Sequence, residues 1–366
     1  MATIKSRKHA NSFNHQINAT LAAMLLPVAA HAGTPPQAQH HARAMPEVTV
    51  NGSAENDFKA DKASSPKYTE ALVDTAQTIT VIKKELIQQQ GAVTLTEALR
   101  NTPGVGTFFL GENGNTNTGD SIYMRGFDSS TSIYVDGVRD IGSVSRDVFN
   151  IEQIDVLKGP AGTDNGRAAP TGSVNLVSKQ ASLQDAISGT VTAGSGSAKR
   201  VTADLNRTIN ERSGSAFRLN VMAQDSGNPA RDIVNNKRWA IAPSFAFGLN
   251  GPTRAYLNFL HVDQDNTPDG GVPTVGLPGY SSPDPKRPFL TGAAPVNPDG
   301  FYGSATDYDK VNADMLTFKV EHDVARGVKL HNTSRYGKTS QDYLLTALTA
   351  NTANLVTPDP ANPAGW

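Results

Sequence analysis

The residue types that carry catalytic or metal chemistry occur in this chain, but their spacing supports neither. The eight histidines are scattered apart from His40-His41, and no His-Glu-x-x-His pattern occurs, so we expect no metal site. The absence of cysteine excludes disulfides, thiolate ligands and cysteine nucleophiles. Gly111 and Gly114 lack the helix and the Lys-Ser/Thr of a phosphate-binding loop, and no serine lies in a nucleophile elbow. We therefore expect neither a cofactor nor an enzyme.

A different chemistry, backbone pairing with a partner, is indicated near the N-terminus. Residues 46–52 alternate apolar and polar side chains, and they follow a polar stretch at 33–44 that is typical of a disordered tail. The centre of this segment consists of Glu47, Val48, Thr49 and Val50. A short extended segment on a mobile tail can add as a strand to the edge of a partner's sheet. A Val-Thr-Val run alone is weak evidence, so this interpretation depends on what surrounds it.

The first residues have the features of an export signal. Lys5, Arg7 and Lys8 precede an apolar run at 19–30, and Ala30-His31-Ala32 forms a small-x-small cleavage pattern. We interpret residues 1–32 as a signal peptide, with a disordered or amphipathic leader as the alternative. No run of about 18 apolar residues occurs, so the sequence predicts no transmembrane helix.

The middle of the chain predicts a small α+β domain. The stretch 151–179 indicates two strands joined by a long Gly-rich crossing. Thr94 and Glu97 form a capping box, which predicts a helix start. Asp136-Gly137 is typical of a tight hairpin turn. Together these elements place the domain at about 68–180.

From Asp185 onward apolar and polar residues alternate in segments of strand length. Such strands, with one apolar face, are typical of an outer-membrane β-barrel, although a soluble β-sandwich alternates in the same way. Tight turns at 250–252 and 325–327 and long connections at 225–236 and 263–310 favour the barrel. The seven predicted strands are 187–195, 199–209, 215–224, 237–249, 253–262, 312–324 and 327–342.

The composition argues against a nucleic-acid partner. Charged residues make up 18% of the chain, below the roughly 25% of soluble domains. The net charge is −1, so the chain as a whole exerts no electrostatic attraction on nucleic acid. We therefore expect none among its partners.

Several motifs resemble those of the TonB-dependent outer-membrane receptors. The shared motifs are Leu99 to Val105, Met124 to Phe127, Tyr134 to Asp140 and Ile151 to Lys179. Narrower segments are similar to the Fiu-type catecholate siderophore receptors. These segments are Gly111 to Asn115, Ile141 to Asp147 and Asn266 to Gly271.

The resemblance implies an α+β plug domain at 68–180, followed by antiparallel transmembrane β-barrel strands within 185–366. Residues 33–67 are then a flexible tail whose TonB box is 47–50. The implied location is the Gram-negative outer membrane. The implied function is energy-coupled uptake of a ferric catecholate siderophore, with TonB, its inner-membrane energising complex and outer-membrane lipid as partners. The alternative is an outer-membrane protein that senses surface ligands or binds phage or bacteriocins without transport.

One departure from the family pattern concerns length. Plugged outer-membrane transporters close with about 22 strands. The residues from Asp185 to Trp366 are too few for that number at about ten residues a strand. An open sheet edge in lipid leaves backbone groups unsatisfied. We therefore expect this chain to be a fragment or a truncated product that includes only about seven strands.

The resemblance also implies a ligand site at the outward end of the plug. A ferric catecholate is anionic and rimmed by aromatic rings, so arginines, aromatic faces and hydrogen-bond donors suit it. The expected ligand-binding residues are Phe108, Phe109, Glu112, Asn113, Asn115, Arg139 and Arg146. Arg146 is the preferred cation, whereas Arg125 and Arg139 are expected to form structural ion pairs between plug and barrel. Core packing is the alternative for one of the two phenylalanines.

Overall fold

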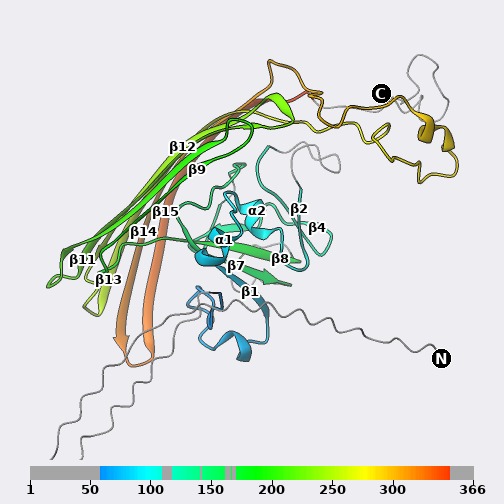
Figure 1. The fold of residues 1–366 in the computed structure, drawn as a ribbon. Helices are drawn as coiled ribbons and strands as arrows, with labels where there is room; N and C mark the ends of the chain where they lie inside the picture. The colour runs from blue at the N-terminus through cyan, green and yellow to red at the C-terminus, as the bar shows by residue number, and fades with distance from the viewer. Residues whose placement is uncertain (1–57, 109–117, 141, 161–165, 167–169, 347–366) are drawn as a thin grey trace, which may run out of the picture. The chain divides into compact units, whose positions relative to one another are not determined.

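The computed structural model describes residues 58–108, 118–140, 142–160, 166 and 170–346. These residues form two small sheets with short helices, which we call the plug, and one sheet of seven long strands, which we call the wall (Figure 1). The predicted signal peptide and the box at 47–50 lie outside the described residues. No helix in the described part of the chain is long and apolar enough to cross a membrane.

The larger plug sheet has the strand order β1-β7-β8-β5-β6. Its strands are β1 (Thr78–Lys83), β5 (Ile133–Val135), β6 (Val138–Arg139), β7 (Ile151–Lys158) and β8 (Gly172–Ser178). β5 and β8 are parallel and the other pairs are antiparallel. The predicted Asp136-Gly137 turn joins β5 to β6, with φ of 50° and 78° at its two residues. Both values lie in the left-handed region that such hairpin turns require.

The rest of the plug packs on this sheet. It comprises the 3₁₀ turn η1 (Leu72–Asp74), helices α1 (Lys84–Gln89) and α2 (Leu95–Leu99), and strands β2 (Val105–Phe108), β3 (Ser121–Met124) and β4 (Phe127–Asp128). The core joins α2, β3 and β7 through Leu95, Leu99, Ile122, Met124 and Ile154, all fully buried.

The predicted capping box starts α2. The backbone N–H of Glu97 donates to Thr94 Oγ1 at 3.3 Å, and Glu97 Oε2 accepts from the N–H of Thr94 at 3.1 Å. A Thr94→Ala substitution is expected to lower the free energy of unfolding by about 1 kcal/mol, since it leaves a helix N–H without a partner. Urea unfolding of the detergent-solubilised protein measures this loss. An unchanged midpoint would show that the cap does not stabilise the plug.

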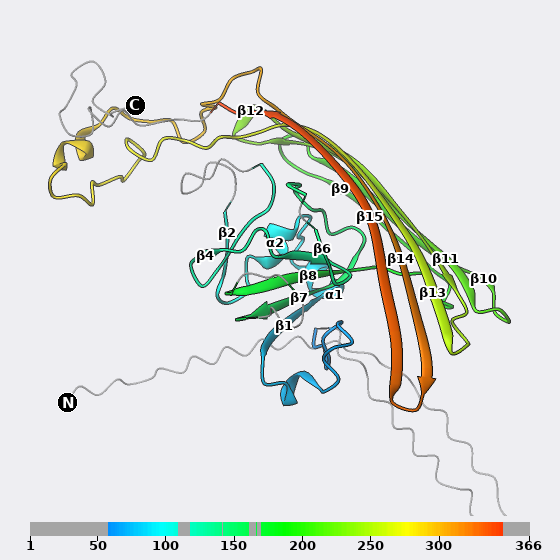
Figure 2. The ribbon, with the colours of Figure 1, turned by 180° about the vertical axis from the view of Figure 1, so that it is seen from behind.

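The wall contains all seven predicted strands. They are β9 (Ala186–Ala193), β10 (Lys199–Asn210), β11 (Ser215–Asn228), β12 (Arg231–Phe247), β13 (Thr253–Thr267), β14 (Tyr308–Ala325) and β15 (Val328–Leu344). Each pairs antiparallel with its sequence neighbours, so β9 and β15 are the edges. The long strands lie side by side in both opposite views (Figures 1 and 2).

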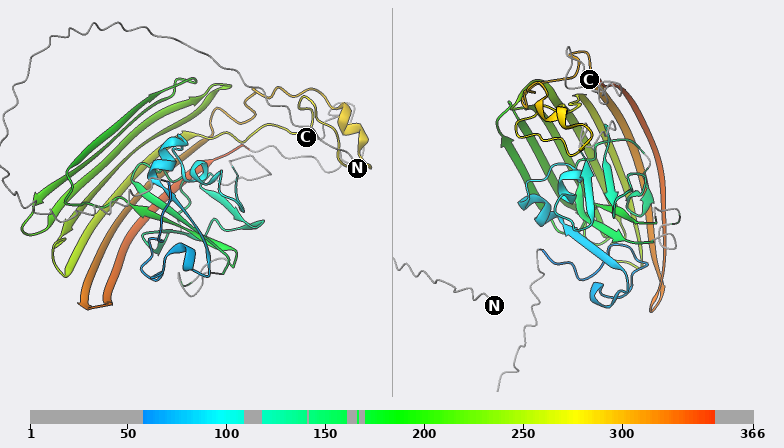
Figure 3. Two further views of the ribbon diagram at one scale, coloured as in Figure 1. Left: turned by 60° about the horizontal axis from the view of Figure 1, so that its bottom comes forward. Right: turned by 90° about the vertical axis from the view of Figure 1, so that its right-hand side faces the viewer.

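The predicted long connection at 225–236 is wrong. β11 and β12 extend into it, and only Pro229 and Ala230 separate them. Pairs such as Asp225 with Lys237 continue the ladder, because polar residues pair as strands where no apolar face is required. The connection from β13 to β14 is long, as predicted. It includes the 3₁₀ turn η3 (Pro288–Gly292) and extends beyond the ends of the strands (Figure 3).

The wall has an apolar face and a polar face. Large apolar side chains, among them Trp239, Phe247 and Phe318, are exposed. Polar side chains such as Asn206, Asn220 and Gln264 are instead buried on the side that contacts the plug. This arrangement is the reverse of a soluble sandwich and is typical of strands with a lipid-facing exterior.

Candidate functional site

Eight of the predicted site residues are not tested by the structure. The box at 47–50 and the residues Phe109, Glu112, Asn113 and Asn115 lie outside the described part of the chain. Their roles therefore remain predictions. The four predicted residues that the structure does describe lie in the plug, and each has a defined environment.

Phe108 ends β2 and packs edge-on against Tyr123, with ring centroids 4.9 Å apart. This contact corresponds to core packing, which was the alternative to ligand contact for one of the two phenylalanines. Arg139 lies in β6, and its Nε donates to the carbonyl of Thr131 at 2.7 Å. Arg125 occupies an exposed turn with a φ of 51°. Neither arginine forms an ion pair with a described wall residue, in contrast to the structural pairs expected for them.

Arg146 is bound within the plug. Its Nη1 lies 2.9 Å from Asp120 Oδ2 and its Nη2 lies 2.9 Å from Asp140 Oδ2, while the carbonyls of Val144 and Gly142 accept further bonds. The Arg146 side chain is 9% exposed and that of Asp120 is fully buried. Burial raises the pKa of the Asp120 carboxyl, and the charge and hydrogen bonds of Arg146 oppose that rise. Charged hydrogen bonds from Arg146 therefore hold both Asp120 and Asp140.

Ion pairs do join the plug to the wall. In those of Asp147 and Asp136 the plug supplies the carboxylate and the wall supplies an arginine. Asp147 lies 2.7 Å from Arg200 of β10 and 3.5 Å from Arg238 of β12. Asp136 lies 3.6 Å from Arg335 of β15. These three arginines lie on the plug-facing side of strands whose side chains alternate between the two faces. That alternation was the sequence signal that could have identified them.

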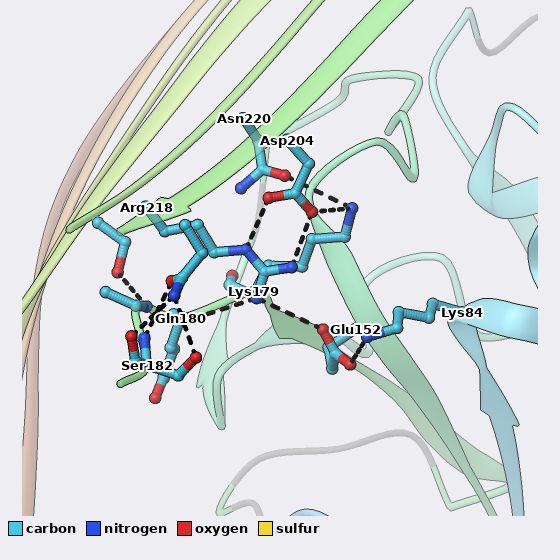
Figure 4. Close-up of polar contacts among 12 residues, drawn as sticks. Lys84, Glu152, Lys179, Gln180, Ser182, Asp204, Arg218 and Asn220 are labelled. Atoms are coloured by element: carbon cyan, nitrogen blue, oxygen red, sulfur yellow. Dashed lines mark hydrogen bonds and ion pairs between the residues drawn. The ribbon is translucent and has the colours of Figure 1, made fainter. Parts of the chain in front are cut away.

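A second polar network holds the end of β8 against β10 and β11 (Figure 4). Arg218 makes a forked contact with Asp204, at 2.8 Å from Nε and 2.7 Å from Nη2. Lys179 of the plug lies 3.0 Å from the same carboxylate. Arg218 also lies 3.8 Å from Glu152 of β7, which pairs with Lys84 at the start of α1. Arg218 of the wall is thus connected to two parts of the plug sheet. It contacts β7 through Glu152, and it contacts the end of β8 through Asp204 and Lys179.

This buried network is expected to stabilise the plug–wall contact. Arg218→Ala leaves Glu152 and Asp204, whose side chains are 37% and 14% exposed, with less compensation. We expect a cost of about 3 kcal/mol, the lower end for a broken buried pair. The matched control is Arg207→Ala, since Arg207 pairs with Asp185 at 2.9 Å in an exposed position and its loss is expected to cost below about 1 kcal/mol. Urea unfolding of both variants tests the difference. Equal losses would show that burial does not strengthen the network.

Two cavities lie where the plug meets the wall. The flank cavity, of about 580 Å³, lies between the plug segment 138–147 and β13–β15, and both Arg139 and Arg146 line it. The loop-side cavity, of about 460 Å³, is lined by Phe108 and Arg238. The structure therefore brings the two predicted cations together but places Phe108 at a different cavity. Among the described residues, no group of three or more metal-ligating side chains is close enough to hold a metal ion.

Comparison with known proteins agrees with this architecture. Residues 71–173 match the family described as the TonB-dependent receptor plug domain. The plug and its antiparallel wall have the arrangement of the solved receptors that match this chain. The chain is 47% identical to the catecholate siderophore receptor Fiu of Escherichia coli (strain UTI89) over 88% of its own length. It is 34% identical to the probable siderophore receptor PiuA of Acinetobacter baumannii over 86% of its length.

Solved structures give the same result. The closed form of the ferric-catecholate import receptor Fiu from E. coli K12 matches with a TM-score of 0.75 and 49% identity, over 81% of this chain and 42% of that one. PiuA from A. baumannii matches with a TM-score of 0.70 and 32% identity, over 82% of this chain and 42% of that one. The chain spans about two fifths of the curated relatives it matches, 42% of Fiu and 41% of PiuA.

Proposed function

We propose that this protein takes up a ferric catecholate siderophore across the outer membrane. The observation that carries this proposal is the 47–48% identity to catecholate siderophore receptors over 85–88% of the chain. Relatives named for a hydroxamate ligand are more distant, since the ferrioxamine B receptor of Salmonella typhimurium is 26% identical. The relatives at 47–48% identity are named as catecholate siderophore receptors.

The proposal assigns roles to the predicted residues. Phe109, Glu112, Asn113 and Asn115 contact the ligand at the outward end of the plug, and Arg139 contributes a cation from the flank cavity. Arg146 acts through the carboxylates that it binds, because all three of its guanidinium nitrogens donate within the plug. Glu47 to Val50 pairs with TonB, whose inner-membrane complex supplies the energy. Outer-membrane lipid covers the apolar face of the wall.

Growth under iron limitation tests the ligand class. The protein is expressed from its own gene in a host without other siderophore receptors, with iron supplied as the ferric complex of dihydroxybenzoate or as ferrioxamine B. Growth on the first but not the second is expected, because the proposed site suits an anionic, aromatic-rimmed complex. Growth on ferrioxamine B alone would contradict the catecholate assignment, and growth on neither would contradict uptake.

A further inference from the structure

The long connection between β13 and β14, residues 268–307, is a folded loop. Within it Leu290 and Val296 are buried. The N–H of Val296 donates to the carbonyl of Gly276 at 2.8 Å. Gly276 has a φ of 95°, and a Cβ there would clash with the carbonyl oxygen of Ala294, so only glycine fits this position. The loop therefore has buried apolar side chains and backbone hydrogen bonds of its own.

The end of this loop that leads into β14 is fixed to the wall. Asp307 is buried and accepts from the N–H of Ser304 at 3.1 Å. It also accepts from the N–H of Thr346 at 2.9 Å and from the Thr346 hydroxyl at 2.8 Å. Thr346 lies just beyond the end of β15. A buried carboxylate thus ties the end of the loop to the strand that follows β14.

The other end of the loop is held by Arg231, the first residue of β12. Its Nη1 lies 2.6 Å from Asp269 Oδ2 at the start of the loop. Its Nε donates to the carbonyl of Gly300 and its Nη2 donates to the carbonyl of Pro298, both at 3.1 Å. One guanidinium therefore joins both halves of the loop to the β11–β12 hairpin. The planar fork of an arginine can serve several acceptors in this way, whereas a lysine ammonium is a single point charge.

The hairpin that carries Arg231 is itself supported by a neighbouring turn. Only Pro229 and Ala230 separate its two strands. The N–H of Gly227 donates to the carbonyl of Gly196, in the turn between β9 and β10, at 2.9 Å. The two backbones are in close contact, since a Cβ on Gly196 would lie 2.8 Å from the nitrogen of Pro229. Arg231 therefore anchors the loop to a braced part of the wall.

The anchored segment forms part of the loop-side cavity. Pro268 and Asp269 line this cavity from the loop. Pro229 lines it from the hairpin and Phe108 lines it from the plug. Arg231 is not one of the described residues that line the cavity, although its partner Asp269 is. The Arg231–Asp269 pair thus fixes the loop against the hairpin beside the cavity.

We propose that Arg231 is a positioning residue for ligand capture, because it holds the loop 268–307 beside the loop-side cavity before the ligand arrives. This proposal rests on the proposed uptake function and concerns the first binding of the ferric catecholate. A loop that is already ordered loses little conformational freedom when the ligand binds, which favours affinity. Arg231 acts through Asp269 and two backbone carbonyls, without contact with the ligand.

The concentration dependence of binding and uptake tests this role. In Arg231→Ala the concentration of ferric dihydroxybenzoate that gives half-maximal surface binding is expected to rise about tenfold, because binding must then order the loop. The maximal uptake rate, normalised to the receptor in the outer membrane, is expected to stay within about twofold, since only ground-state binding is lost. Arg231→Lys is expected to bind with intermediate affinity, because it keeps the charge but not the fork. An unchanged half-maximal concentration in Arg231→Ala would overturn the role, as would a fall in the maximal rate alone.

The matched control is Arg287→Ala. Arg287 lies in the same loop and pairs with Asp284 at 2.6 Å, but this pair is local and leaves the ends of the loop in place. We expect neither the half-maximal concentration nor the maximal rate to change in this variant. An equal rise in the half-maximal concentration for both variants would show that the loss of any arginine near the loop weakens binding, and it would overturn the specific role of Arg231.

A double variant separates positioning from direct ligand contact. In an Asp269→Ala background Arg231 has lost its carboxylate partner, so Arg231→Ala is expected to raise the half-maximal concentration by a clearly smaller factor than in the unaltered protein. An undiminished factor would show that Arg231 acts on the ligand directly and would overturn the positioning role. If the unaltered protein binds no probe, the proposed function itself fails. Normal binding that does not depend on Arg231 refutes this inference alone.

Discussion

Deleting Glu47, Val48, Thr49 and Val50 is expected to reduce uptake of ferric dihydroxybenzoate to the level of cells without the receptor. The described plug is held by its own core and by the wall. Surface binding of the probe should therefore stay within about twofold of the unaltered protein, because strand pairing with a partner is separate from ligand contact. Radioiron uptake and binding, measured on the same cells, give both values.

The matched control is the deletion of four residues from 33–44, which shortens the same polar tail without altering the box. This variant is expected to retain uptake. Accumulation of iron by the box variant at the control's rate would show that the box does not couple the receptor to an energy source. Loss of uptake in both variants would assign the effect to tail length.

Arg146→Ala is expected to lower the free energy of unfolding by about 3–5 kcal/mol, because it leaves the buried Asp120 carboxylate without its charged partner. The Asp140 carboxylate and three backbone carbonyls lose donors at the same time. Urea unfolding of the detergent-solubilised protein measures the loss. If Arg146 instead acts mainly as a ligand contact, the variant should unfold normally and bind the probe more weakly, by about 1.5–3 kcal/mol for one charged hydrogen bond.

A second background separates charge from packing. In Asp120→Asn the buried carboxylate is gone, so the further change Arg146→Ala is expected to cost clearly less than it does in the unaltered protein. Arg212→Ala, at an exposed turn between β10 and β11, is the surface control, with an expected change within about 0.5 kcal/mol. If Arg146→Ala lowers the free energy of unfolding as much in the Asp120→Asn background as in the unaltered protein, the Arg146–Asp120 ion pair is not the source of the stabilisation.

The elements that the sequence predicts best are those set by local pattern. Alternation over about ten residues locates every wall strand, because one face meets the plug and the other is apolar and exposed. The capping box at Thr94 and the Asp136-Gly137 turn are likewise defined by neighbouring residues. Strand ends are predicted less well. Beyond the apolar band, β11 and β12 continue through polar residues that pair without alternating.

Contacts between distant residues could not be predicted in the same way. Asp136 and Arg335 meet only because β5 and β15 lie on facing sides of one cavity. Ser64 reads as part of a polar linker, and only the folded sheet shows that Asp155 lies beneath it. The choice of Arg125 and Arg139 as structural cations followed the family resemblance. The pairing observed instead depends on which wall strands face the plug.

The most direct test of the proposed uptake compares binding and accumulation of one probe in paired cells with and without TonB. Ferric dihydroxybenzoate labelled with radioiron is added to cells that express this receptor alone. Equal surface binding in both strains, with accumulation only where TonB is present, is the predicted result. Accumulation at the same rate without TonB, or no binding in either strain, would contradict energy-coupled uptake of a ferric catecholate.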